Sequence, residues 1–248
     1  MAYDDTRRIV AIIQARLGSK RLPGKVLARI GNSSLLTILI HRLEQSRYID
    51  EIVVATTTKK NDDAIVELAK REGVSWHRGS DRDVLQRYCE TARRFKADLI
   101  VRVTADNPLT DPELMDRLIE AHLKDGWDYS YCPDAPLGTG VEIINHAALD
   151  MADSAALSRS EREHVTLYLL LHQDKLAIQR VESPVIDPRV RLTVDTAADL
   201  TLMNALYEKL GPLQDVTIKD VVELLQNDPQ LSEINKDVKQ KNVNDRAQ

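Results

Sequence analysis

The sequence predicts an α/β protein in which a mostly parallel sheet lies between layers of helices. Short apolar runs that suit buried strands occur at Ile9–Gln14, Glu51–Thr56 and Leu99–Thr104. Stretches with the apolar spacing of helices lie between these runs, at Asp62–Arg71 and Asp83–Phe95. The chain has 248 residues, of which 43% are hydrophobic, and this is enough to bury one core of ordinary size. We therefore expect a single domain built from βαβ units.

The second half of the chain continues this pattern with more irregular segments. Asp111, Pro112 and Glu113 predict a helix start, because they supply an N-cap carboxylate, a proline at the first helical position and a further acid. This helix should run to about Leu123. The segment WDYSYCPDAPLGTGVEII then predicts a strand, a flexible loop over Pro133–Gly140 and a second strand. The remaining expected elements are a strand at Val141–Asn145, helices at His146–Ala156 and Arg162–His172, strands at Ala177–Val181 and Val190–Val194, and a helix at Thr196–Leu210.

The overall charge and the cysteine content exclude several classes of function. The chain has 34 Lys and Arg against 39 Asp and Glu, a net charge of −5, and no basic tail, so we expect no nucleic-acid partner. Cys89 and Cys132 lack metal-ligand spacing, which indicates neither a disulfide framework nor a zinc site. The N-terminus lacks the apolar region of a signal peptide, and no run approaches a membrane span. We expect a cytoplasmic protein without membrane contact.

Positive charge is concentrated near the N-terminus. Residues 6–43 contain eight Lys or Arg and no Asp or Glu, which indicates a site for a small polyanion. At its centre, IIQARLGSKRLPGKVL (Ile12–Leu27) follows the first predicted strand. Gly18 and Gly24 would permit unusual backbone angles, and Ser19 and backbone amides would bond phosphate oxygens. The cations that would neutralise the phosphates are Arg16, Lys20, Arg21 and Lys25.

This segment predicts a phosphate cradle of neither common type. A Walker loop requires Ser or Thr directly after the lysine, where this chain has Val26 after Lys25. The glycine fingerprint of dinucleotide-binding proteins is also absent from this segment. A solvated basic loop is the alternative interpretation.

Two aspartates follow predicted strands and are candidate metal ligands. Asp106 comes after Leu99–Thr104, and Asp195 comes after Val190–Val194. Carboxylates at the C-terminal ends of strands face the crevice in which α/β folds bind ligands, and Mg²⁺ prefers one or two carboxylates together with substrate phosphates. The alternatives are that Asp106 stabilises a turn in ADNP and that Asp195 caps the following helix.

The segment Ile12–Leu27 resembles the N-terminal signature of the cytidylyltransferases that make CMP-activated sugar acids, most closely the branch of spore-coat polysaccharide biosynthesis proteins of the F type. The resemblance continues through RGSDRDVLQRY, VRVTADNPLTDP, GVEII, REHVTLY and RLTVDTAADL, to about Leu210. It implies a three-layer α/β/α nucleotidyltransferase fold, Rossmann-like and related to the glycosyltransferase A fold. The implied reaction transfers CMP from CTP to an acceptor oxygen and releases pyrophosphate.

The resemblance also implies roles for individual residues. It assigns Arg16 and Lys25 to the triphosphate, Asp106 and Asp195 to Mg²⁺, and His164 to the surroundings of the reacting acceptor oxygen. These five are the candidate catalytic residues. The candidate nucleotide-binding residues are Ala15, Arg16, Gly18, Ser19, Lys20, Arg21, Lys25, Arg87, Arg102 and Thr104, and the candidate acceptor-binding residues are Gly140, Glu142, Arg162 and His164.

Several of these residues also have a purely structural interpretation. His164 could be a structural hydrogen-bonding residue, and Arg87 a solvated residue of its helix. Glu142 could be an ordinary exposed strand carboxylate. Asp81 and Asp83 are expected to cap the helix that follows them.

The expected organisation is one nucleotidyltransferase domain over residues 1–230, in which residues 129–189 shape the acceptor pocket and a homodimer contact carried from the relatives. The polar residues 231–248 are expected to form a frayed tail. The partners are then a nucleotide and a small anionic acceptor. QAR, where better-known sugar-acid synthetases have PAR, favours the spore-coat branch, in which a nonulosonic acid, another sugar acid or a phosphonate could be the acceptor.

Two other classes of protein remain as alternatives. A glycosyltransferase of the related fold would carry a D-x-D metal motif, but no second Asp lies two positions from Asp106. A non-catalytic nucleotide-binding or nucleic-acid-binding module would need neither candidate metal aspartate, and the acidic remainder of the chain does not favour nucleic acid.

Overall fold

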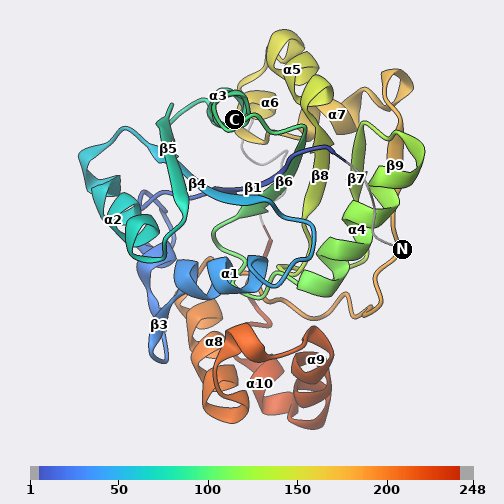
Figure 1. Ribbon diagram of the computed structural model, residues 1–248. Helices are drawn as coiled ribbons and strands as arrows, with labels where there is room; N and C mark the ends of the chain where they lie inside the picture. The colour runs from blue at the N-terminus through green and yellow to red at the C-terminus, as the bar shows by residue number, and fades with distance from the viewer. Residues whose placement is uncertain (1–5, 241–248) are drawn as a thin grey trace.

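A computed structural model describes residues 6–240. Across these residues, seven strands form one mixed sheet in the order β5-β4-β1-β6-β8-β7-β9 (Figure 1). The neighbours from β5 to β6 are parallel, β8 runs antiparallel to both β6 and β7, and β9 is parallel to β7. The strands are β1 (Ile9–Gln14), β4 (Glu51–Thr57), β5 (Ser75–Gly79), β6 (Leu99–Thr104), β7 (Tyr129–Tyr131), β8 (Glu142–Asn145) and β9 (Ile178–Arg180).

Helices cover both faces of the sheet, and a small hairpin of β2 (Arg29–Ile30) and β3 (Ser33–Ser34) stands apart from it. The α-helices are α1 (Leu35–Leu43), α2 (Asp63–Arg71), α3 (Val84–Arg94), α4 (Pro112–Asp125), α5 (His146–Ala155), α6 (Arg159–Glu163), α7 (Leu167–Leu171), α8 (Ala197–Leu210), α9 (Ile218–Asn227) and α10 (Pro229–Glu233). Short 3-10 helices are η1 (Lys25–Leu27), η2 (Lys60–Asp62), η3 (Gln173–Lys175) and η4 (Leu213–Asp215).

The central strand β1 shows why the fold has three layers. Successive side chains of a strand point to opposite faces, and parallel strands are buried on both. Ala11 and Ile13 pack with α1, α2 and α4, whereas Val10 and Ile12 pack with α3, α5 and α7. The predicted α/β/α sandwich with a mostly parallel mixed sheet is therefore confirmed.

A third hydrophobic cluster joins the C-terminal helices to the rest of the domain, below the sheet in Figure 1. Residues of α8 and α9 pack there with Ile30 of β2 and Leu35 of α1. Arg42 of α1 is 1% exposed and donates to the carbonyls of Thr110, Leu213 and Val216. Burial lowers the pKa of the Arg42 guanidinium to about 10, although the charges of two nearby aspartates oppose this shift.

The order of the sheet defines a crevice. From β1 the chain proceeds outward through β4 to β5, and then returns to place β6 on the other side of β1. The carboxyl ends of β1 and β6 therefore flank the point where the strand order reverses. Open α/β sheets bind ligands in the crevice at this point.

Most elements lie where the sequence predicts them, but three expectations were wrong. Val190–Val194 forms no strand and makes only an isolated bridge, from Arg191 to Leu137 in the loop before β8. The next residue of that loop, Gly138, has a positive φ and so ends the extended pairing. The predicted helix Arg162–His172 is broken into α6 and α7 at His164, whose ψ of 43° is not helical. By contrast, the predicted strand Ala177–Val181 is confirmed as β9, which is one residue shorter at each end.

The third correction concerns the predicted tail. Leu231 packs in the third cluster, and the buried Asn235 donates to the Arg191 carbonyl and to Asp199. The Gln240 side chain accepts from Arg191 at 2.6 Å. Residues 231–240 therefore contribute contacts to the domain and are not frayed, while residues 241–248 lie outside the described residues. Within residues 6–240 the structure holds no helix of the length and hydrophobicity needed to cross a membrane.

Gly138 fixes the loop before β8 against residues 190–194. Its φ is +100°, and a Cβ atom there would lie 2.4 Å from the Thr193 amide nitrogen. We expect Gly138→Ala to lower the free energy of unfolding by about 2 kcal/mol or more, because backbone strain and the clash add. Gly140→Ala is the matched control, since its Cβ would only meet Ala135 at 3.8 Å. Equal urea midpoints for the two variants would contradict this account.

His122 should make stability depend on pH. This fully buried side chain of α4 contacts the Ser130 hydroxyl at 2.8 Å, and burial lowers its pKa from 6.5 to about 4. The unfolded chain takes up the proton first, so the contribution is complete above pH 6.5 and is lost as pH falls towards 4. It amounts to about 3 kcal/mol. We expect the unfolding free energy of His122→Gln, measured with urea, to fall less between pH 6.5 and 4 than that of the wild type. Parallel pH dependences of the two proteins would contradict this role of His122.

Candidate active site

The loop after β1 is closed by a backbone hydrogen bond and held in place by the Asp62 side chain. Gly24, with φ +73°, donates its N–H to the Leu17 carbonyl at 3.0 Å. The Leu17 N–H donates to Asp62 Oδ1 at 2.8 Å, and the other oxygen of this buried carboxylate accepts from the Thr57 hydroxyl at the end of β4. Of the two glycines, only Gly24 needs its left-handed conformation, because the φ of Gly18 is not positive and its surroundings are open.

Lys25 joins three distant segments of the chain. Its Nζ donates to Asp106 Oδ2 at 2.9 Å, to Asp195 Oδ1 at 2.7 Å and to the Val194 carbonyl at 2.8 Å. Lys25 is 8% exposed. We call Lys25, Asp106 and Asp195 the Lys25 cluster; it lies in the crevice beyond β1 and β6.

Two arginines hold the other oxygen of Asp195. Arg21 and Arg191 contact Oδ2 at 2.8 and 3.1 Å. Burial raises the pKa of the Asp195 carboxyl, but the hydrogen bond and charge of Lys25, with the two arginines, outweigh it, so the pKa lies below its ordinary value. Arg191 also donates to Asp199 at 2.9 Å.

The local alternatives for the two aspartates are not what the structure shows. Thr196 caps α8, with its side chain accepting from the Asp199 N–H, so the Asp195 carboxylate is not the cap. In ADNP, Asn107 makes the side-chain contact of the turn, donating to the Thr104 hydroxyl at 2.9 Å. Both carboxylates point instead to Lys25.

The other predicted phosphate-binding side chains surround this cluster less closely. Arg16 is exposed and lies 3.6 Å from Asp81, which also pairs with Lys59 at 2.6 Å. The Lys59 ammonium, more than Arg16, lowers the pKa of Asp81. Lys20 is exposed, Ser19 accepts from the Leu22 N–H at 3.3 Å, and Ala15 is buried with its N–H on the Ala55 carbonyl.

Arg87 is not the solvated residue that one interpretation allowed. It is 2% exposed, packs against Gly79 and donates to the Ser80 carbonyl. Burial lowers the pKa of its guanidinium. The side chain therefore supports the Ser80–Asp81 backbone from beneath. Asp83 caps α3 as predicted, but Asp81 does not, because it pairs with Arg16 and Lys59.

A cavity of about 280 Å³ adjoins the Lys25 cluster. Its lining combines the ends of β6 and β8 with the loop before β8, namely Arg102, Thr104, Asn107, Tyr131, Cys132, Pro133, Ala135, Pro136, Leu137, Gly138, Gly140, Val141 and Glu142. Thr104 and Asn107 flank Asp106 in the sequence, which places the cavity beside the cluster. Arg102, Thr104, Gly140 and Glu142 are thus brought together.

Glu142 is paired inside the protein and is not an ordinary exposed carboxylate. It contacts Arg102 and the Tyr129 hydroxyl, and accepts from the Thr166 hydroxyl at 2.9 Å. Burial lowers the pKa of Arg102, but the charge and hydrogen bond of Glu142 outweigh it and raise the pKa above its ordinary value. The fixed charges of the cavity wall therefore balance.

His164 and Arg162 lie outside this lining. His164 ends α6, where its N–H donates to the Ser160 carbonyl at 2.8 Å. Arg162 donates to Asp83 at 2.8 Å and to both the carbonyl and the carboxylate of Asp153. It joins α6 to the start of α3 and to α5.

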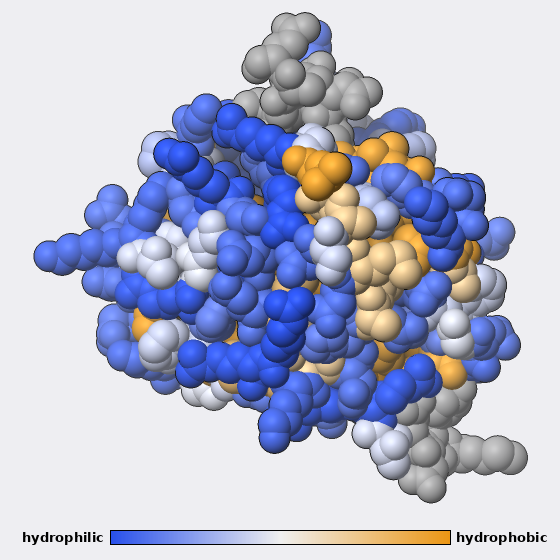
Figure 2. All heavy atoms as spheres, turned by 90° about the horizontal axis from the view of Figure 1, so that it is seen from above, coloured by the Kyte–Doolittle hydropathy of each residue, from blue (hydrophilic) through white to orange (hydrophobic). Residues whose placement is uncertain are grey.

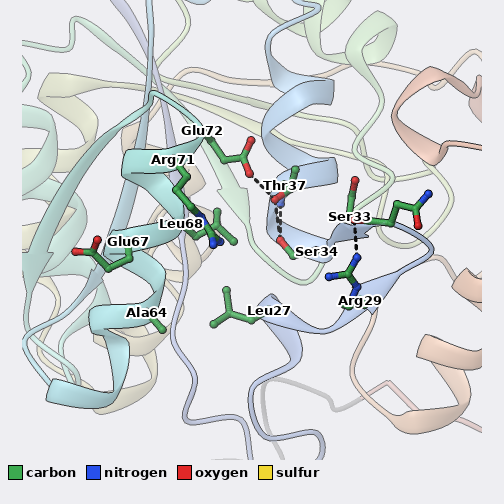
Figure 3. A pocket seen from close by; sticks show the side chains of 11 residues that line it. Leu27, Arg29, Ser33, Ser34, Thr37, Ala64, Glu67, Leu68, Arg71 and Glu72 are labelled. Atoms are coloured by element: carbon green, nitrogen blue, oxygen red, sulfur yellow. Dashed lines mark hydrogen bonds between the residues drawn. The ribbon is translucent and has the colours of Figure 1, made fainter.

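A larger cavity, of about 580 Å³, lies elsewhere, between α1 and α2 (Figure 3). Thr37 on its wall donates to Glu72 at 2.8 Å, and Arg71 of α2 projects between the two helices. None of the candidate site residues lines it. Size alone would therefore select the wrong place for the predicted chemistry.

Comparison with known proteins identifies the family. The cytidylyltransferase family profile matches residues 10–244. The chain belongs to the cytidylyltransferase family. It is 41% identical to the spore coat polysaccharide biosynthesis protein SpsF of Bacillus subtilis, over 89% of this chain and 95% of that protein.

Solved structures agree with the fold. A cytidylyltransferase from Leptospira borgpetersenii serovar Hardjo-bovis superposes with a TM-score of 0.88 at 29% identity, covering 95% of this chain and all of that one. CMP:2-keto-3-deoxy-manno-octonic acid synthetase complexed with CTP superposes with a TM-score of 0.65 at 18% identity, covering 82% and 99%. The second likeness concerns the fold alone.

In this cytidylyltransferase, Asp106 and Asp195 of the Lys25 cluster are the candidate ligands of a magnesium ion. Among residues 6–240 no group of three or more His, Cys, Asp or Glu could hold a metal. Mg²⁺ is commonly bound by one or two carboxylates, with substrate phosphates and waters supplying the remaining ligands. In the structure, the Lys25 ammonium lies between these two carboxylates.

Sequence reasoning did not identify several supporting residues. Asp62 has the sequence context of a helix cap, and only the fold brings it to the Leu17 N–H. Arg191 precedes Asp195 by four residues and Asp199 by eight, and it forms ion pairs with both. Because a strand was predicted at Val190–Val194, this spacing did not indicate the ion pairs.

Asp62 is expected to position the loop after β1. Its side chain makes no cap hydrogen bond for α2, so Asp62→Ala removes chiefly the anchor of Leu17 and Thr57. We expect the unfolding free energy to fall by about 2 kcal/mol and the Leu17 amide to exchange faster with solvent. Asp63→Ala, which removes an exposed pair with Arg78, should change stability by less than about 1 kcal/mol. Unchanged protection of Leu17 in Asp62→Ala would refute the anchor.

Proposed function

We propose that the protein transfers CMP from CTP to a sugar acid and releases pyrophosphate, as a step in polysaccharide biosynthesis. The observation that carries the proposal is the Lys25 cluster at the strand-order reversal, with a small cavity beside it. The names of the related proteins support both halves: SpsF is named for spore coat polysaccharide biosynthesis, and the synthetase of 2-keto-3-deoxy-manno-octonic acid was solved with CTP.

The basic loop supplies charge to the triphosphate. Arg16 and Lys20 are exposed and would neutralise charge on the phosphates and the departing pyrophosphate, and Lys25 would join them once its aspartates bind Mg²⁺. The acceptor hydroxyl attacks the α-phosphorus in line. The new P–O bond forms as the bond to the β-phosphate oxygen breaks, and the hydroxyl proton passes to solvent.

Charge balance supports the requirement for Mg²⁺. Lys25, Arg21 and Arg191 are matched by Asp106, Asp195 and Asp199 through the contacts described above, so this network has no excess positive charge for a triphosphate. Asp106 and Asp195 would hold the ion. When bound, Mg²⁺ supplies Lewis-acid stabilisation of the charge on the phosphates.

The cavity favours an acceptor rich in hydroxyl groups. The charges of the cavity wall balance, because Arg102 is paired with Glu142. The wall also carries hydrogen-bonding groups, including those of Thr104, Asn107 and Tyr131. A sugar acid presents one carboxylate and many hydroxyls. This is a better match than a multiply charged phosphonate.

The homodimer and the cytoplasmic location belong to the same proposal. Met151, Leu157 and Leu171 are large exposed hydrophobic residues within the predicted dimer region 129–189, and Leu157 is 92% exposed. Figure 2 shows hydrophobic atoms gathered on part of an otherwise mostly hydrophilic face. Such a patch is typical of an interaction surface.

Pyrophosphate release tests the proposed reaction. We expect release from CTP, and much less from ATP, GTP or UTP, when 2-keto-3-deoxy-manno-octonic acid or a related sugar acid and Mg²⁺ are present. Asp106→Asn should reduce the rate on the order of 100-fold or more, because a metal-binding charge is lost. Asp63→Asn is the control. Release that is equal for all four nucleotides, or unaffected by Asp106→Asn, would contradict the proposal.

A further inference from the structure

Lys25 uses its whole hydrogen-bonding capacity within the protein. An ammonium has three donors, and the Nζ of Lys25 has three oxygen partners at 2.7–2.9 Å. The side chain is also nearly excluded from solvent. It cannot keep these contacts and also donate to a phosphate in the same way, so binding of a triphosphate by Lys25 requires that contacts to the carboxylates break.

The position of the ammonium is also the position required for a metal ion. Lys25 lies between Asp106 Oδ2 and Asp195 Oδ1, the two side chains proposed to bind Mg²⁺. Two cations that share these oxygens at contact distance would repel each other. Arg21 and Arg191 both bind Asp195 through Oδ2, so they keep this carboxylate in place while Oδ1 exchanges one cation for another.

We propose that the Lys25 ammonium is a built-in competitor of the metal ion: it occupies the metal position in the nucleotide-free protein and leaves it when the nucleotide phosphates draw the lysine away. This inference rests on the proposed function and goes beyond it. The free protein then binds divalent cations weakly, and metal and nucleotide bind together. By linkage, each promotes binding of the other.

Titration of the nucleotide-free full-length protein with Mn²⁺ alone, followed by the EPR signal of the free ion, tests this competition. Lys25→Met removes the competing charge, and we expect it to bind Mn²⁺ about tenfold more tightly than the wild type. Lys20→Met changes the net charge equally but concerns an exposed lysine, and it should shift the affinity less than about twofold. Lys25→Arg keeps a cation between the carboxylates and should bind as weakly as the wild type.

The outcomes separate this inference from the proposed function. Equal Mn²⁺ affinity in wild type, Lys25→Met and Lys20→Met overturns the competition, even if the wild type releases pyrophosphate from CTP. Absence of CTP-dependent release in the wild type overturns the proposed function, whatever the Mn²⁺ titration shows. If Lys25→Met does not fold, as circular dichroism would show, Lys25→Gln replaces it: it removes the charge and keeps an amide donor. Its Mn²⁺ affinity is then judged against the same wild-type and Lys20→Met values.

Discussion

The ion-pair network around Lys25 is the constraint on which the arrangement of the site depends. One ammonium, in the loop after β1, binds Asp106 after β6 and Asp195 before α8, which lie 81 and 170 residues further along the chain. Three cations and three carboxylates balance within this network. Buried charges are tolerated only when they are paired and hydrogen-bonded, so removal of any one member leaves another without compensation. The same network therefore holds the three segments of the crevice together.

The rest of the fold supplies rigid supports for this network. Asp62 holds the loop that carries Lys25, and Gly138 allows the loop before β8 to lie directly against residues 190–194. From behind, Asn235 and Gln240 hold Arg191, which in turn holds Asp195. The C-terminal residues thus contribute to the site although they follow α10, the last helix that the structure describes.

The two sides of the crevice differ in charge. The side of the basic loop offers Arg16 and Lys20 in exposed positions, suited to phosphates that arrive from solvent. On the opposite side, Arg102 is neutralised by Glu142 within the cavity wall. This division agrees with the proposed function, in which a triphosphate and a hydroxyl-rich acceptor meet at the crevice.

The sequence by itself determined the parallel strands, the helices between them, the basic segment Ile12–Leu27 and the two aspartates, because these depend on local periodicity and residue type. It could not determine that Lys25 contacts Asp106 and Asp195, since ion pairs across such distances arise only when the strands assemble. Nor could it tell that Arg87 is buried or that Glu142 is paired with Arg102: burial and partners depend on neighbouring layers. The predicted strand Val190–Val194 shows the same limit, because its apolar residues suit a strand but tertiary packing gives it only one bridge. Local pattern specifies which elements form; the close approach of distant side chains decides what the site can bind.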